Sequence, residues 1–294
     1  MTNLDLRADH GRVMEARSLD EARTIVLSDA HGYPQMIAEA LEHARFEPGV
    51  DRLIYAGDFL DRGDRPEECL SMLEDAGAEM LWGNHEVAVL LSQTIFPQGR
   101  ESLGFWERLL QRFETGAWQL VTCVGDVLVS HAGVSSEYSR AFALVGFSSE
   151  ALAARINEEF REAAERGLAD ERLGEPCRVL DERGPLWMRP DWEGPEGMLA
   201  GVTQVAGHTA PAGRIVRELR DAGVHLVDPG AAQAWGASDL PPCRYAVISG
   251  EAIAVLQEDG APDPATPRAC PTAGGRIGRR FPKEVHLCLP MSNC

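Results

Sequence analysis

Short clusters of carboxylate, amide and imidazole side chains recur between residues 29 and 209, and glycines accompany them. These groups, with no thiolate among them, suit divalent ions such as Mn, Fe or Zn. Six such side chains are more than one ion with an open position needs, so they predict two ions that share a bridging carboxylate. Two ions roughly 3.5–4 Å apart hold both oxygens of an in-line phosphoryl displacement and generate hydroxide from water near neutral pH. The six are Asp29, His31, Asp58, Asn84, His131 and His208.

Each cluster follows a short apolar run that predicts a buried strand. Apolar residues with helical spacing separate the first three strands, over residues 34–45 and 66–76. This alternation of strands and helices implies a parallel sheet, and ligands gather at the carboxyl ends of such strands. The strands are expected at 24–27, 53–56 and 78–82.

The pattern changes after residue 120. Residues 120–124 and 127–130 flank Gly125-Asp126 and predict a β-hairpin. Ser149 is the expected N-cap of a long helix that stops at Gly167, and residues 170–200 predict irregular structure. Further strands are expected at 202–206, 224–227, 244–249 and 252–256. The predicted fold class is α/β, with two mixed β-sheets packed as a sandwich and flanked by helices.

Composition divides the 294-residue chain into three parts. Residues 1–22 are predicted to be a polar leader and residues 23–257 a single folded domain. Residues 258–294 are rich in Pro, Gly and Arg and predict a loosely ordered tail. A solvated tail is the expectation, and an arm that lies on the acidic body or binds a partner is the alternative.

Charge and cysteine content limit the function classes. The chain has 28 Lys and Arg against 46 Asp and Glu, a net charge of −18, which argues against binding to nucleic acid or an anionic membrane surface. No apolar run approaches the roughly 18 residues of a membrane span, and no secretory signal is expected. Seven scattered cysteines, never in C-x-x-C spacing, predict a reducing cytoplasm rather than a disulfide framework.

Five motifs in order resemble the set of the metallophosphoesterase (calcineurin-like) superfamily, and more narrowly its phosphoprotein phosphatase branch and the bacterial Shewanella-like serine/threonine phosphatases. They are Asp29-x-His31-Gly32, Gly57-Asp58-x-x-Asp61-Arg62-Gly63, Gly83-Asn84-His85-Glu86, His131-x-Gly133 and Gly207-His208-Thr209. They span about 180 residues, so a chance match is disfavoured. Two departures are Ser28, where many relatives have Gly, and the missing extended C-terminal motif of the eukaryotic protein phosphatases.

The resemblance implies the metallophosphoesterase fold and a role for each motif residue. Asp29, His31 and Asp58 are implied to hold one ion, with Asp58 bridging to a second ion held by Asn84, His131 and His208. Manganese is the ion expected to support activity in vitro.

The same resemblance implies the residues that act on the substrate. His85 is the implied general acid, and Asp61 orients it and tunes its pKa. Arg62 is implied to bind the substrate phosphate, and Arg189 resembles a second phosphate-binding arginine.

Three functions stay open at this point. The first is a metal-dependent phosphatase for phosphoserine or phosphothreonine in proteins, which Asp61-Arg62-Gly63 and Glu86 favour by analogy. The second is a bis(5′-nucleosyl)-tetraphosphatase or a small-metabolite phosphatase that uses the same site. The third is a metal-binding regulatory module without catalysis, against which the intact His85 and Asp61 count.

Two further residues near the motifs have open roles. Asp228 ends a predicted strand and is a candidate to hydrogen-bond a ligand histidine. His225 lies in the same strand, where a core or surface position is favoured over a contact with the site.

Overall fold

The computed structural model describes residues 23–93, 95, 99–141, 146–169, 180–234, 239–250 and 252–257. The predicted leader and tail lie outside these described residues, as do residues 170–179 of the stretch predicted to be irregular. Among the described residues, no helix has both the length and the apolar character that crossing a membrane requires.

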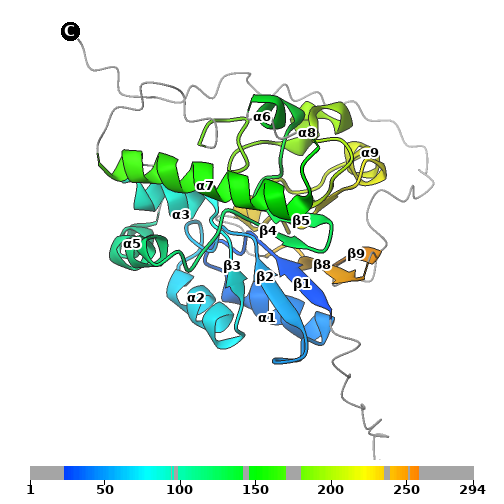
Figure 1. The fold of residues 1–294 in the computed structure, drawn as a ribbon. Coiled ribbons are helices and arrows are strands. Elements are labelled where there is room, and N and C mark those ends of the chain that lie inside the picture. Colours follow the sequence, from blue (N-terminus) through cyan, green and yellow to red (C-terminus); the bar gives the residue numbers. More distant parts are fainter. Residues whose placement is uncertain are drawn as a thin grey trace, which may run out of the picture.

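One mixed sheet contains the first three predicted strands. Its strands, in order across the sheet, are β3 (Glu79–Met80), β2 (Arg52–Tyr55), β1 (Thr24–Leu27), β8 (Arg244–Ser249) and β9 (Ala252–Gln257). The pairs of β1 with β2 and of β2 with β3 are parallel, whereas β8 is antiparallel to β1 and to β9. Helices α1 (Pro34–Ala44) and α2 (Pro66–Asp75) make the crossovers and lie together along one side of this sheet (Figure 1). The predicted alternation is confirmed, although β3 is shorter than the expected 78–82.

The second sheet begins with the predicted hairpin. Its strands, in order, are β4 (Val121–Val124), β5 (Val127–Ser130), β6 (Thr203–Ala206) and β7 (Val224–Leu226). The β4–β5 pair is antiparallel, and β5, β6 and β7 are parallel.

The two sheets pack face to face through alternate residues of their strands, since successive side chains of a strand point to opposite faces. Val26 of β1 and Ile54 of β2 meet Val129 and Val205 of the second sheet in one buried apolar cluster. The intervening residues of β1 and β2, such as Ile25, pack instead with α1 and α2. The predicted sandwich of two mixed sheets is therefore confirmed.

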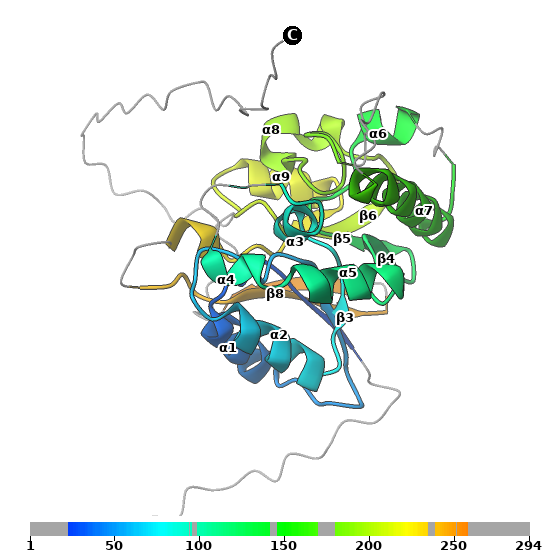
Figure 2. The same cartoon turned by 90° about the vertical axis from the view of Figure 1, so that its left-hand side faces the viewer.

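The remaining helices flank the sandwich, with α6, α8 and α9 together on the side away from α1 and α2 (Figures 1 and 2). They are α3 (Asn84–Leu90), α4 (Arg100–Leu103), α5 (Trp106–Glu114), α6 (Ser136–Ala141), α7 (Ser149–Leu168), α8 (Pro190–Glu193), α9 (Ile215–Asp221) and the short 3₁₀ turns η2 (Pro195–Gly197) and η3 (Ala231–Ala234).

The long helix α7 begins differently from the prediction. Its N-cap is Ser148 rather than Ser149, because the Ser148 hydroxyl accepts the N–H of Ala151. The Ser149 hydroxyl instead donates to the carbonyl of Asp126, which ties α7 to the β4–β5 turn. The helix also runs through Gly167 to Leu168, one residue past the expected stop.

Candidate active site

The six predicted metal ligands gather at the carboxyl ends of strands from both sheets. At least one of them follows within three residues of the end of each of β1, β2, β5 and β6, and Asn84 opens α3 shortly after β3. All six are at most 7% exposed. Asp29 and His208, which are 179 positions apart, are joined directly by a hydrogen bond of 2.9 Å from the His208 N–H to Asp29 Oδ2.

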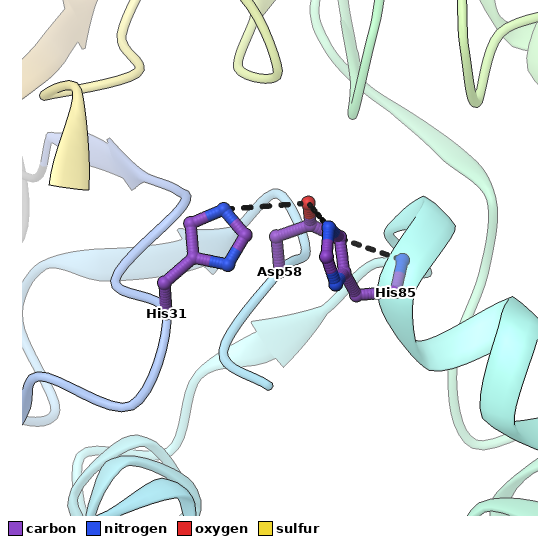
Figure 3. A group of neighbouring side chains, drawn as sticks. All are labelled: His31, Asp58 and His85. Carbon is purple, nitrogen blue, oxygen red and sulfur yellow. Dashed lines mark hydrogen bonds and ion pairs between the residues drawn. The ribbon is translucent and has the colours of Figure 1, made fainter. Parts of the chain in front are cut away.

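Asp58 lies between the imidazoles of His31 and His85 (Figure 3). Its Oδ2 is 3.7 Å from Nε2 of His31 and 3.9 Å from Nε2 of His85, whose backbone N–H donates to Oδ1 at 3.1 Å. Candidate ligand atoms of these three residues all lie within 4.8 Å of one another. Asp29, the third ligand that the resemblance implies here, adjoins them with Oδ1 3.9 Å from Nε2 of His31.

A second cluster shares Asp58 and centres on Nε2 of His131. That atom lies 2.8 Å from Asn84 Oδ1, 3.2 Å from His208 Nδ1 and 3.4 Å from Asp58 Oδ2. The structure therefore brings all six predicted ligands together. Asp58 belongs to both clusters, which is the position that a bridging carboxylate requires.

The histidine tautomers show what these clusters can bind. Nδ1 of His131 lies 2.8 Å from the carbonyl of Ala56, and Nδ1 of His31 lies 2.9 Å from the carbonyl of Leu60. Because a carbonyl only accepts hydrogen bonds, each Nδ1 carries the proton and each Nε2 turns a bare lone pair toward Asp58. Such a convergence of oxygen and nitrogen lone pairs fits divalent cations.

Electrostatics point the same way. Burial raises the pKa of Asp29 and of Asp58 well above the usual value, and neighbouring carboxylates add to both shifts. Burial also lowers the pKa of His31 and His208 well below the usual range and that of His131 to about 3. The imidazoles are therefore neutral and offer no charge to the carboxylates, which favours the binding of divalent cations between them.

Backbone strain is concentrated in this site. Left-handed φ angles are uncommon outside glycine and cluster at functional positions. Among the described residues, eight non-glycine residues adopt such an angle, and six of them are predicted site residues. The six are Asp29, His31, Asp58, Asp61, Arg62 and His208.

The pair that the resemblance assigns to proton transfer is in direct contact. Nδ1 of His85 lies 2.5 Å from Oδ2 of Asp61. Burial lowers the pKa of His85, and the Asp61 carboxylate opposes that shift. Since Nδ1 is taken by Asp61, Nε2 is the nitrogen that faces Asp58 and the candidate metal ligands.

Glu86 organises the site in a way that the sequence motif did not reveal. Its buried carboxylate accepts four backbone N–H groups, those of Asp58, Phe59, Leu60 and Gly83, at 2.8–3.1 Å. Burial raises the pKa of Glu86 to about 7. A usable signal was present in the sequence, because Glu at the third position after a helix N-cap typically reaches back to cap the helix start. The bonds to the loop after β2 need the three-dimensional structure.

The two arginines expected to bind phosphate both lie at the site. Arg189 donates from Nη1 to the His208 carbonyl at 3.0 Å, and its guanidinium lies 5.4 Å from the centre of the Trp192 ring. Arg62 is half-buried, and its charge helps to lower the pKa of His31 and His85.

The two residues with open roles have different surroundings. Asp228 is buried and accepts the N–H of Gly230 at 2.7 Å, and its charge raises the pKa of Asp29. His225 is partly exposed in β7, opposite Val205.

A family model described as calcineurin-like phosphoesterase matches residues 22–212, well over half of the chain. The chain belongs to this family. The metallophosphoesterase is 37% identical over 65 residues to serine/threonine-protein phosphatase 1 of Salmonella typhimurium. This matched stretch covers 22% of this chain and 30% of that protein. It is 35% identical over 69 residues to the symmetrical bis(5′-nucleosyl)-tetraphosphatase of Actinobacillus succinogenes, which covers 23% of this chain and 25% of that protein. The metallophosphoesterase thus spans less than a third of the length of either relative.

A solved structure supports the fold over a longer stretch. The cold-active protein-tyrosine phosphatase of a psychrophilic Shewanella species superimposes with a TM-score of 0.55 at 18% identity, covering 84% of this chain and 83% of that chain. The predicted superfamily and its sandwich fold are confirmed by these comparisons. The metallophosphoesterase therefore combines the fold of its family with candidate metal-binding clusters at the strand ends.

Proposed function

We propose that residues 23–257 form a single catalytic domain that hydrolyses phosphate monoesters with two divalent ions. Phosphoserine and phosphothreonine in proteins are the proposed substrates. The 2.5 Å contact between His85 Nδ1 and Asp61 Oδ2 carries this proposal. An alkoxide that leaves from serine or threonine is strongly basic and needs a proton in the transition state, which a carboxylate-bound imidazole provides.

The proposed ligands of the ions come from the two clusters and from Asp29, which adjoins the first cluster. Asp29, His31 and Asp58 are proposed to hold one ion, and Asp58, Asn84, His131 and His208 the other. When bound, the ions supply Lewis acidity that neutralises phosphate charge and lowers the pKa of water. Manganese is the proposed ion in vitro, since carboxylate and amide oxygens suit it.

The chain's own residues supply the remaining steps. Asp61 holds Nδ1 of His85, so that Nε2 gives its proton to the departing oxygen. Arg62 and Arg189 are proposed to bind the phosphate oxygens, because a guanidinium offers two parallel donors to them. Arg189 already donates from Nη1 to His208, which orients it at the site.

A second candidate function is hydrolysis of dinucleoside polyphosphates or of a small phosphorylated metabolite. The similarity to a symmetrical bis(5′-nucleosyl)-tetraphosphatase supports this alternative. A phosphate leaving group is less basic than an alkoxide, however, so it depends less on the His85–Asp61 pair.

A direct comparison of substrates tests the proposal. Purified protein with added manganese is expected to release phosphate from phosphoserine and phosphothreonine peptides with a higher kcat/KM than from diadenosine tetraphosphate. Higher turnover of diadenosine tetraphosphate would select the second function. If protein shown to hold metal releases no phosphate from any phosphoester, the remaining function is a metal-binding regulatory module without catalysis.

A further inference from the structure

Asp61 is held from several directions, and two of its partners lie outside every sequence motif. Beyond the contact with His85, its Oδ1 accepts the backbone N–H of Gly99 at 2.9 Å. Its own backbone N–H donates to the Ser102 hydroxyl at 3.2 Å. Gly99 and Ser102 belong to the connection between α3 and α5, and Ser102 lies in α4. This connection carries none of the proposed metal ligands.

Burial and strain make the Ser102 contact important for the backbone conformation of Asp61. Both residues are only 1% exposed, so water cannot replace a lost hydrogen bond. Asp61 also has a φ of 67°, a left-handed conformation that persists only when its surroundings hold it. The Ser102 hydroxyl satisfies the peptide N–H in that conformation, while Gly99 fixes one carboxylate oxygen and leaves the other to His85.

The same three residues favour the ionised form of Asp61. Burial alone raises the pKa of this carboxyl, but hydrogen bonds from His85, Ser102 and Gly99 outweigh burial and lower the pKa below the usual value. An ionised carboxylate keeps the Nδ1 proton of His85 in place, so Nε2 stays turned toward Asp58.

We propose that Ser102 is a positioning residue for proton donation by His85. It holds Asp61, and Asp61 holds the imidazole with Nε2 aimed at the departing oxygen of the substrate. The inference rests on the proposed role of His85. The assisted step starts from His85 protonated on both nitrogens. Water forms the new P–O bond and releases a proton to solvent, the old P–O bond breaks with its electron pair on the departing oxygen, and the Nε2 proton moves to that oxygen, which leaves neutral His85 with its proton on Nδ1.

This role predicts a dependence on the leaving group that a general loss of stability does not produce. Ser102→Ala, assayed with saturating manganese, is expected to lower kcat for a phosphoserine peptide about tenfold with KM unchanged. Its kcat for p-nitrophenyl phosphate is expected to fall less than about threefold, because nitrophenolate leaves without a proton. Ser102→Thr retains the hydroxyl and is expected to restore the peptide activity.

Two other variants serve as controls. Ser149→Ala removes a serine hydroxyl bond of 2.7 Å at the start of α7, so it is expected to reduce stability without changing the ratio of the two activities. If Ser102→Ala does not fold, Ser102→Cys keeps the volume with a weaker acceptor and is expected to change the ratio in the same direction.

The inference and the proposed function fail in different ways. If His85→Asn loses both activities by the same factor, His85 is not the proton donor and the proposed function loses its support. If His85→Asn changes the ratio but the folded Ser102 variants leave it at the wild-type value, only the positioning role of Ser102 is overturned.

Discussion

Asn84 Oδ1 lies 2.8 Å from Nε2 of His131, although the two residues are 47 positions apart in the chain. Nδ1 of His131 donates to the Ala56 carbonyl, so Nε2 has no proton to offer and both facing atoms carry lone pairs. Two such atoms at this distance repel each other in a buried site unless a cation lies beside both. The contact therefore favours a metal centre on the chemistry of two side chains alone.

Asp58→Asn tests whether one residue serves both clusters. The variant removes the charge of the carboxylate that the two clusters share, so both ions and the activity are expected to be lost together. Metal content by mass spectrometry and phosphate release check this. The matched control is Asp51→Asn, a buried aspartate that pairs with Arg23, which is expected to keep both ions. A variant that loses one ion and keeps the other would show that Asp58 does not bridge.

His85→Asn separates proton donation from metal binding. The variant is expected to keep both ions while kcat for a phosphoserine peptide falls by about 10²–10⁴, the usual contribution of a general acid. Metal content must be measured alongside kcat, because His85 also lies within ligand distance of His31 and Asp58. Loss of an ion would make His85 a metal ligand in place of Asp29.

Whether the sequence could predict a contact depends on how far apart its two residues lie in the chain. Asp29 and Asp58 could be placed because each lies within three residues of the end of a short buried strand, and parallel strands bring their ends together. Ser102 could not be placed, since it meets Asp61 across 41 positions from a short helix with no motif of its own. The N-cap of α7 could not be predicted for a related reason. Ser148 and Ser149 are chemically identical candidates, and only the folded structure decides between them.

In metal-free protein, the buried carboxyls of the site are expected to lose stabilising free energy as the pH rises. Burial raises the pKa of Glu86 to about 7 and that of Asp228 to about 6, above their values in an unfolded chain. A carboxyl with a raised pKa stabilises the fold fully below its unfolded pKa and loses that contribution as the pH passes its folded pKa. Between about pH 5 and about pH 7.5 these carboxyls therefore lower the Tm of chelated protein, whereas the buried histidines with lowered pKa values raise it up to their unfolded pKa of about 6.5. The contribution of Glu86 is measured as the difference between wild type and Glu86→Gln.

Added manganese tests whether the metal-free site gains negative charge as the pH rises. Bound cations offset the charge of the deprotonated cluster, so manganese should raise the Tm more at about pH 7.5 than at about pH 5. Glu86→Gln removes one titrating carboxyl, so the change in Tm of chelated protein from about pH 5 to about pH 7.5 should be more positive than in wild type. The Tm should be lower overall, because an amide nitrogen cannot accept the backbone N–H groups. If the Tm of that variant changes with pH as the wild-type Tm does, Glu86 does not contribute to the pH dependence of stability.

Gly207→Ala tests how closely the backbone must approach the ligands. A Cβ at this position would lie 2.2 Å from Asp29 Oδ2, the oxygen that accepts the His208 N–H, so Asp29 must move. We expect manganese affinity, measured by titration calorimetry, to fall about 10- to 100-fold, as when partners that orient metal ligands are lost.

The control is Gly167→Ala in α7, where the new methyl meets only the end of the Leu91 side chain at 3.0 Å. That variant should bind manganese normally. Equal manganese affinity in the two variants would show that the β6 end is not part of the metal centre.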